Sequence, residues 1–207
     1  MGGSLVENPL RHGPAPRGLT LIETGYWDGR ALRHERLHRA RLQAGADALG
    51  WSAPEFTFSG PASPARLRLT LDATGAIAQD SHPLPPSLTE WRVGLAAARL
   101  ASNDPWLRVK SSQRATYDAA RAALPDGLDE MIFRNERDEV CDGTITTVFF
   151  DRGDGMRTPP LSSGLLPGVL RAALGCPEEV LLARDLPLVR LWLGNSLRGL
   201  SPARFIP

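Results

Sequence analysis

The sequence predicts a mixed α/β fold in two halves that meet near residue 103. Segments with strand-like and helix-like patterns alternate along the whole chain, and no internal repeat interrupts them. The polar segment 101–105, which ends in proline, separates two halves that each contain both kinds of element. We therefore expect a smaller N-terminal α/β domain over residues 1–101, a linker at 102–105 and a C-terminal domain over 106–207.

Composition excludes several classes of protein. The chain has 207 residues, 42% hydrophobic and 23% charged, which is ordinary for a soluble globular protein. A formal net charge of +1 argues against a nucleic acid or an anionic membrane as the main partner. No apolar run reaches the ~18 residues of a membrane span, and no secretory signal is visible. The two cysteines have no metal-binding or redox spacing, so we expect a cytoplasmic protein.

In the first half, residues 1–18 read as a loose leader, and 19–26 as a strand that closes at Asp28 and Gly29. Residues 35–50 have a helical pattern whose expected apolar face is Leu37, Ala40, Ala44 and Ala48. Arg41 falls on that same face, so it must find an anion or extend to water. Further strands are expected at 66–71, which alternates strictly, at 76–78 and at 91–98.

In the second half, a helix is expected over 113–124 and a strand over 130–135, followed by a hairpin tip at 136–139. The β-branched and aromatic stretch 139–150 reads as the next strand, with Asp142 at its entrance. A short helix should begin near Pro167, because proline suits a first turn. Short strands are expected at 179–183 and 191–193, and a polar turn at 195–199.

Two residue types stand out chemically. Lys110 is the only lysine of a chain rich in arginine, which makes it a candidate for a task that arginine cannot perform, such as forming an imine. A lone acid such as Asp142 usually marks a solvated turn. Lys110 upstream and the glycine-led helix start at 166–169 downstream favour another reading, in which the three hold an aldehyde cofactor, its ring nitrogen and its phosphate.

Several ordered motifs resemble those of the fold-type IV pyridoxal-phosphate enzymes, a family with the two-domain fold of D-amino acid aminotransferase. They cover residues 19–203 and read LIETGYWDGR, KSSQRATYDAAR, DEMIF, EVCDGTITTVFF, TPPLSSGLLPGVLR and GNSLRGL. The pattern is most similar to the short proteins related to 4-amino-4-deoxychorismate lyase. The resemblance implies pyridoxal 5′-phosphate as cofactor, a small-molecule substrate and a homodimer.

The resemblance also implies roles for single residues. Lys110 would be the Schiff-base lysine and proton shuttle, and Asp142 the acid at the pyridine nitrogen, where the family usually has a glutamate one methylene longer. The residues implied for the cofactor phosphate are Arg41, Gly168 with the backbone amides of Val169 and Leu170, and Ser196. The residues implied for the substrate are Thr24, Leu197 and Arg198.

Some of these positions leave alternatives open. Glu23 and Thr24 match the first-domain strand that faces the cofactor, but outward positions on an edge strand fit equally well. Ser196 and Leu197 could form a purely structural turn, and Arg198 could face solvent. Thr147 stands where the family commonly has asparagine, which removes one amide from the site.

The reaction expected from the resemblance is that of 4-amino-4-deoxychorismate lyase, which releases pyruvate and 4-aminobenzoate in folate synthesis. The main alternative is a class IV aminotransferase acting on branched-chain or D-amino acids. A third alternative is a cofactor-free homologue without catalytic activity.

Overall fold

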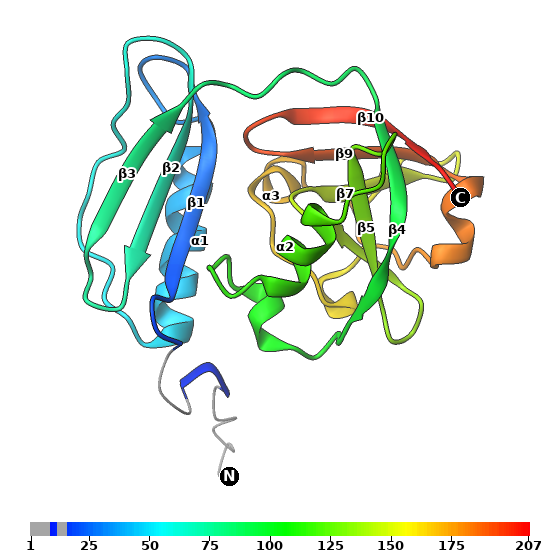
Figure 1. Ribbon diagram of the computed structural model, residues 1–207, viewed down its shortest axis with the longest axis horizontal. Helices are drawn as coiled ribbons and strands as arrows, with labels where there is room; N and C mark the ends of the chain where they lie inside the picture. The colour runs from blue at the N-terminus through cyan, green and yellow to red at the C-terminus, as the bar shows by residue number, and fades with distance from the viewer. Residues whose placement is uncertain (1–8, 12–15) are drawn as a thin grey trace.

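Two β-sheets joined by one crossing segment organise the chain (Figure 1). The computed structural model describes residues 9–11 and 16–207, so most of the predicted leader lies outside the described residues. The first sheet is antiparallel in the order β1-β2-β3, and helix α1 covers one of its faces. Its elements are β1 (Thr20–Trp27), α1 (Glu35–Leu49), β2 (Ala65–Asp72) and β3 (Ile77–His82).

Strand β2 alternates buried and half-buried residues without a break, as its sequence predicts. Leu67, Leu69 and Leu71 are buried in the core under α1. Arg66 and Arg68 therefore lie on the opposite face of the sheet.

The expected apolar face of α1 was wrong. Ala40 and Ala44 are exposed, and the buried residues are instead His38, Leu42, Gly45 and Ala46. Small residues let the helix approach the sheet, since a Cβ on Gly45 would come within 3.1 Å of Leu21. The helix end was predicted well: Gly50 caps it in the left-handed conformation, with φ of 70°.

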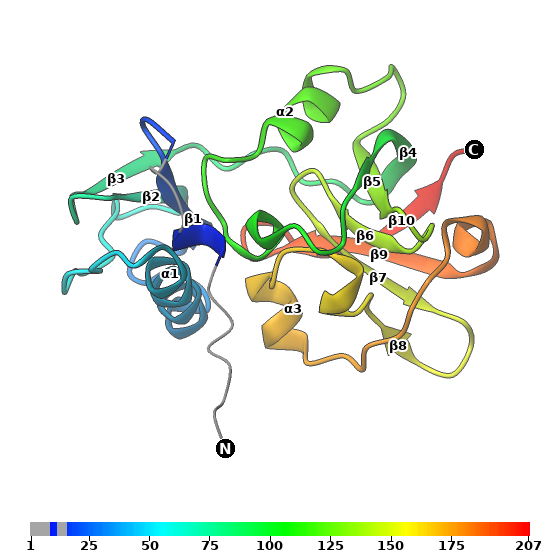
Figure 2. The ribbon, with the colours of Figure 1, turned by 90° about the horizontal axis from the view of Figure 1, so that it is seen from below.

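The second sheet has seven strands in the order β6-β5-β4-β10-β9-β7-β8 (Figure 2). Strand β4 pairs in parallel with β5 and β10, and the other pairs are antiparallel. The strands are β4 (Trp91–Leu100), β5 (Glu130–Asn135), β6 (Val140–Gly143), β7 (Thr147–Asp151), β8 (Met156–Arg157), β9 (Arg190–Asn195) and β10 (Gly199–Phe205).

The chain passes between the sheets in residues 83–90, ahead of the predicted linker. Strand β4 consequently belongs to the second sheet, although the sequence analysis groups it with the first half. The division into domains at 102–105 stays a prediction.

Helical segments flank the second sheet. They are η2 (Pro105–Arg108), α2 (Ala115–Ala122), η3 (Leu161–Ser163), α3 (Val169–Leu174) and η4 (Ala183–Leu188), with η1 (Pro9–Arg11) near the N-terminus. The predicted strand at 179–183 was wrong, because only isolated bridges form at Glu178 and Leu182 before η4 begins. Strand β10 was missed, since its glycine and proline resemble turn signals.

The stretch 139–150 forms two strands rather than one, with a break at residues 144–146. A buried carboxylate from β5 causes the break. Glu130 accepts hydrogen bonds from the backbone amides of Thr144 and Ile145 and from the Thr144 and Thr146 hydroxyls. Within the described residues, no helix has the length and apolar character needed to cross a membrane.

Candidate active site

Lys110 lies where the two sheets meet. Its carbonyl accepts a hydrogen bond from the Ile22 amide of β1 at 2.8 Å, and the next residues continue the contact through a bridge between Ser111 and Leu21. Val109, just before it, is buried in the core of the first sheet. The lysine is therefore anchored on both sides by β1 while its side chain is half-buried.

Burial lowers the pKa of Lys110 to about 7, because desolvation disfavours the ammonium form. Three nearby cations lower it further, namely Arg41, Arg114 and Arg68, whereas Glu23 opposes them. A large fraction of the amine is consequently neutral near pH 7, and the neutral amine is the form that attacks an aldehyde.

Asp142 is the last residue but one of β6, and its side chain is buried. Tyr117 Oη donates to Oδ1 at 3.1 Å, and the Leu166 amide donates to Oδ2 at 3.2 Å. Burial raises the pKa of Asp142 to about 7; Glu130 also raises it, while the two donors and Lys110 lower it. Its hydrogen-bond donors among the described residues are neutral, so a cation beside it would stabilise the charged carboxylate.

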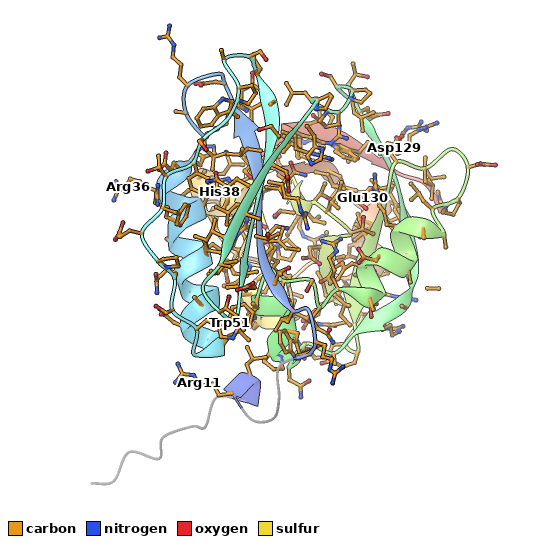
Figure 3. The ribbon with its side chains drawn as sticks, turned by 60° about the vertical axis from the view of Figure 1, so that its left-hand side comes forward. Arg11, Arg36, His38, Trp51, Asp129 and Glu130 are labelled. Carbon is orange, nitrogen blue, oxygen red and sulfur yellow. The ribbon has the colours of Figure 1, made fainter. Side chains whose placement is uncertain are left out.

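Arg41 has a protein anion that the sequence analysis did not assign to it. Arg41 Nε donates to Glu23 Oε1 at 2.8 Å, and Arg41 Nη2 donates to Oε2 at 2.5 Å. His38 Nδ1 lies 2.6 Å from the same Oε2 (Figure 3 shows His38 between α1 and the sheet). Burial opposes the charge on Glu23, but Arg41 and His38 outweigh it and hold the pKa of Glu23 below its ordinary value. Glu23 is thus buried, and its outward alternative was wrong.

The glycine-led helix start forms as expected. Gly168 precedes α3 in an extended conformation, and no side chain caps this helix end. Val169 and Leu170 follow in the first turn, both buried. Helices α1 and α3 lie side by side, which brings the start of α3 to the same layer as α1, the helix of Arg41. A Cβ at Gly168 would come within 2.5 Å of Thr147 Oγ1, so the backbone passes closely over that hydroxyl.

The turn after β9 contains the remaining expected residues. Ser196 Oγ donates to the Thr24 carbonyl at 3.1 Å, which ties the turn to β1. The Leu197 and Arg198 amides donate to Asn195 Oδ1 at 3.1 and 2.9 Å. These bonds form an Asx turn, so the backbone amide of Leu197, a residue implied for the substrate, already has a partner inside the turn.

The structure also adds residues that the sequence analysis did not assign. They are Tyr117, which lies inside the KSSQRATYDAAR motif, together with Glu130, His38 and Arg68. A strict alternation of arginine and leucine in β2 was the one available signal for Arg68, and the others depend on contacts between distant segments.

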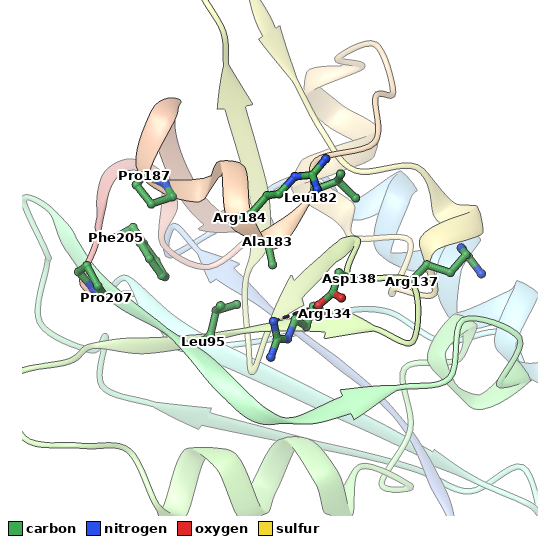
Figure 4. Close-up of a pocket in the computed structure, with 10 residues that line it drawn as sticks. All are labelled: Leu95, Arg134, Arg137, Asp138, Leu182, Ala183, Arg184, Pro187, Phe205 and Pro207. Carbon is green, nitrogen blue, oxygen red and sulfur yellow. Dashed lines mark hydrogen bonds and ion pairs between the residues drawn. The ribbon is translucent and has the colours of Figure 1, made fainter.

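The surface hollow near the C-terminus is separate from the residues described above (Figure 4). A cavity of about 540 Å³ lies there, lined by Leu95, Arg134, Arg184 and Phe205 among others. Lys110 and Asp142 do not line it. No cluster of three or more metal-ligating side chains occurs in the described part of the chain.

The functional side chains near the meeting of the two sheets suit an aldehyde cofactor with a ring nitrogen and a phosphate. Lys110 offers an amine with a pKa of about 7, Asp142 a buried carboxylate whose hydrogen-bond donors among the described residues are neutral, and Arg41 a guanidinium. Each functional group of such a cofactor therefore has a chemically matched side chain.

Comparison with known proteins agrees with this arrangement. The sequence model of the family "Amino-transferase class IV" matches residues 20–206. No curated protein matches the sequence. A crystal structure of a candidate amino-acid aminotransferase from Mesorhizobium loti is 38% identical, with a TM-score of 0.85, over 91% of this chain and 100% of that one.

More distant structures share the fold. The 4-amino-4-deoxychorismate lyase of Pseudomonas aeruginosa is 18% identical, with a TM-score of 0.73, over 90% of this chain and 82% of that one. The branched-chain aminotransferase of Thermoproteus uzoniensis, solved with norvaline, is 20% identical, with a TM-score of 0.74, over 91% of this chain and 78% of that one.

Proposed function

The chain belongs to the class IV aminotransferase family of pyridoxal-phosphate enzymes, and from this premise we propose that it is a 4-amino-4-deoxychorismate lyase. The lyase releases pyruvate and 4-aminobenzoate for folate synthesis. The observation that supports an imine-forming function is the position and pKa of Lys110. This sole lysine lies where the two sheets meet, and its pKa is lowered to about 7. The choice of the lyase rests on the motifs around residues 158–171 and 194–200.

Each cofactor group has a proposed holder. Lys110 would hold the cofactor through its aldehyde group, Asp142 would accept a hydrogen bond from the protonated ring nitrogen, and Arg41 would hold the phosphate. Gly168, the backbone amides of Val169 and Leu170, and Ser196 complete the phosphate site. When bound, the cofactor accepts the electron pair of a bond broken at the substrate carbon that bears the amine.

The protein groups then have distinct tasks. Lys110 takes the proton from the amine-bearing carbon of the substrate and returns it later, a task suited to an amine with a pKa near 7. Asp142 keeps its negative charge against the ring nitrogen. Glu23 fixes the direction of the Arg41 guanidinium through two hydrogen bonds. Thr24, Leu197 and Arg198 are the proposed substrate contacts.

An aminotransferase of branched-chain or D-amino acids is the second candidate. The Mesorhizobium loti structure, described as an amino-acid aminotransferase and 38% identical, favours it. The cofactor-free alternative is set aside, because the chain belongs to a family of pyridoxal-phosphate enzymes. A homodimer and a cytoplasmic location complete the proposal.

Borohydride reduction of the protein incubated with pyridoxal phosphate tests the site. Peptide mapping should find the reduced cofactor on the peptide that contains Lys110, and Lys110→Ala should abolish both this label and turnover. Lys110→Arg is the matched control, since it keeps a long basic side chain but forms no imine. Full turnover in Lys110→Ala would refute the proposal.

The reaction type needs a separate assay. Pyruvate release from aminodeoxychorismate, compared with keto-acid formation from amino-acid donors, distinguishes the two candidates. Pyruvate release without transfer of the amine supports the lyase, and rapid keto-acid formation from leucine or a D-amino acid supports the aminotransferase.

A further inference from the structure

The cavity of about 540 Å³ between the second sheet and η4 has no part in the proposed chemistry (Figure 4). Strands β4 and β5 contribute Leu95 and Arg134 to one side of it. Segment η4 contributes Ala183 and Arg184 to the other side, and the end of β10 contributes Phe205. Small-molecule sites in proteins usually have volumes of roughly 300–1,000 Å³. The cavity is therefore large enough for a small organic ligand.

The pairing of β4 with β5 is irregular beside this cavity. The two strands pair at Leu95 with Ile132 and again at Arg99 with Arg134. Between these pairs β4 has three residues where β5 has only Phe133. Such an irregularity bends one strand away from its partner, and it is frequent beside functional sites. Leu95 and Arg134, which both line the cavity, lie at its two ends.

Much of the cavity wall is apolar. Leu95 and Phe205 are half-buried and pack against the hydrophobic core of the second sheet. Ala183 is buried, and Leu182 and Pro187 extend the apolar surface along η4. Covering such a surface removes it from water, which is favourable when the ligand has an apolar body. A fully polar ligand would gain nothing from these walls.

Positive charge is in excess among the side chains that line the cavity. They include Arg134, Arg137 and Arg184 but only one acid, Asp138. Two arginines already share this acid, since Asp138 Oδ1 lies 2.9 Å from Arg99 Nη1 and 3.0 Å from Arg134 Nη1. An anion in the cavity would therefore be attracted by the arginines and would meet little opposing charge.

Two of the three lining arginines retain donors for a ligand. Arg137 pairs closely with acids of its own hairpin. Arg134 Nε, by contrast, is buried without a hydrogen-bond partner among the described residues. The Arg184 side chain is 82% exposed, and its one ion pair in the described part of the chain, with Asp185, spans 3.9 Å. A buried donor without an acceptor is costly, so an anion that reaches Arg134 would relieve this cost.

We propose that this cavity binds a small amphipathic monocarboxylate. Its hydrocarbon body lies among Leu95, Ala183 and Phe205, and its carboxylate is held by Arg134 and Arg184. Guanidinium groups suit this task because they form charge-assisted hydrogen bonds with carboxylates. A neutral apolar ligand would leave the arginines unpaired, and a short polar anion would leave the apolar walls in water. The site is independent of the proposed function, because neither the cofactor residues nor the substrate residues line it.

Calorimetric titration of the cofactor-loaded protein with octanoate tests the site, with 1-octanol and acetate as comparison compounds. Octanol has the hydrocarbon chain without the charge, and acetate has the charge without the chain. Octanoate should bind about tenfold or more tightly than either, because only octanoate gains both the apolar contact and a charge-assisted hydrogen bond.

Two substitutions on different elements locate the binding. Arg134→Met and Arg184→Met should each weaken the binding of octanoate about fivefold or more and leave that of octanol unchanged. Asp138 keeps its ion pair with Arg99 in the first variant, so the hairpin retains a charge pair. Turnover should be unchanged in both variants. Arg36→Met is the control, because Arg36 points into solvent from α1 (Figure 3).

Equal affinities for octanoate and octanol in the wild-type protein would overturn the proposal, because the arginines would then contribute nothing. An octanoate affinity that survives both cavity substitutions would overturn it as well. Octanoate bound beside Lys110 instead would compete with the substrate and would be insensitive to Arg134→Met, a result that also rejects the cavity. Weaker octanoate binding in both cavity variants, with the wild-type affinity in Arg36→Met, supports the site.

Discussion

The Tyr117 hydroxyl donates a hydrogen bond to Asp142 Oδ1 over 3.1 Å, from helix α2 to the end of β6. The Tyr117 ring packs edge-on against Phe133, with centroids 4.9 Å apart. Burial and the neighbouring Asp142 raise the pKa of Tyr117, so the hydroxyl keeps its proton and remains a donor. Tyr117 therefore fixes where the Asp142 carboxylate lies.

Tyr117→Phe should lower kcat about tenfold, since a hydrogen bond to a charged group contributes about 1.5 kcal/mol. Loss of the donor should also raise the pKa of Asp142 above about 7. The pH profile of kcat should then move to higher pH, which a purely structural role would not produce. An unchanged profile would show that the bond does not tune Asp142.

In the cofactor-free protein, Asp142 and Lys110 should together lower the free energy of unfolding most near pH 7. The pKa of Asp142 is raised from 3.8 to about 7, so the folded state holds its proton more tightly and loses stability as the pH rises through that interval. The pKa of Lys110 is lowered from 10.5 to about 7, so the folded state releases its proton more easily and gains stability from pH 7 upwards.

Urea denaturation at several pH values measures this effect as the difference between wild type and the double variant Asp142→Asn, Lys110→Met. The variant should gain most relative to wild type near pH 7, by a few kcal/mol at ~1.4 kcal/mol per unit of pKa shift. Asp142→Asn alone should remove the fall in stability between pH 3.8 and about 7. Lys110→Met alone should remove the rise in stability above about pH 7. A difference that is flat with pH would contradict both shifts.

The sequence predicted the parts of the site that depend on local pattern. Residue type and order indicate Lys110 and Asp142, and the two lie close enough for the charge of Lys110 to affect the carboxylate. The alternation of β2 and the glycine cap of α1 were likewise local signals. The anion beside Arg41 was not predictable in this way, because Glu23 reaches it across a helix–sheet interface from 18 residues away.

Glu23→Gln should destabilise the cofactor-free protein by about 3 kcal/mol or more, because it leaves the Arg41 charge uncompensated. Pyridoxal phosphate should recover more of this loss than pyridoxal does, since only the phosphate offers Arg41 another anion. Thermal unfolding with each compound measures the difference. Equal recovery by both compounds would show that Arg41 does not contact the phosphate.

Glu130→Gln should disturb the break between β6 and β7 and, through it, Asp142. Both carboxylate oxygens of Glu130 are acceptors: Oε1 receives the Thr144 amide and hydroxyl, and Oε2 receives the Ile145 amide and the Thr146 hydroxyl. A glutamine must turn an amino group towards one of these sets of donors, so buried donors lose their acceptor. We expect a loss of about 2–3 kcal/mol in urea unfolding.

Thr144→Val is the matched control for this prediction. It removes one hydroxyl donor but leaves the carboxylate and the backbone donors in place, so its cost should be about 1 kcal/mol. If Glu130 positions Asp142, Glu130→Gln should also weaken the binding of pyridoxal phosphate, whereas Thr144→Val should have little effect on it. Equal cofactor affinity in the two variants would limit Glu130 to stabilising the fold, because the displaced turn would then not reach Asp142.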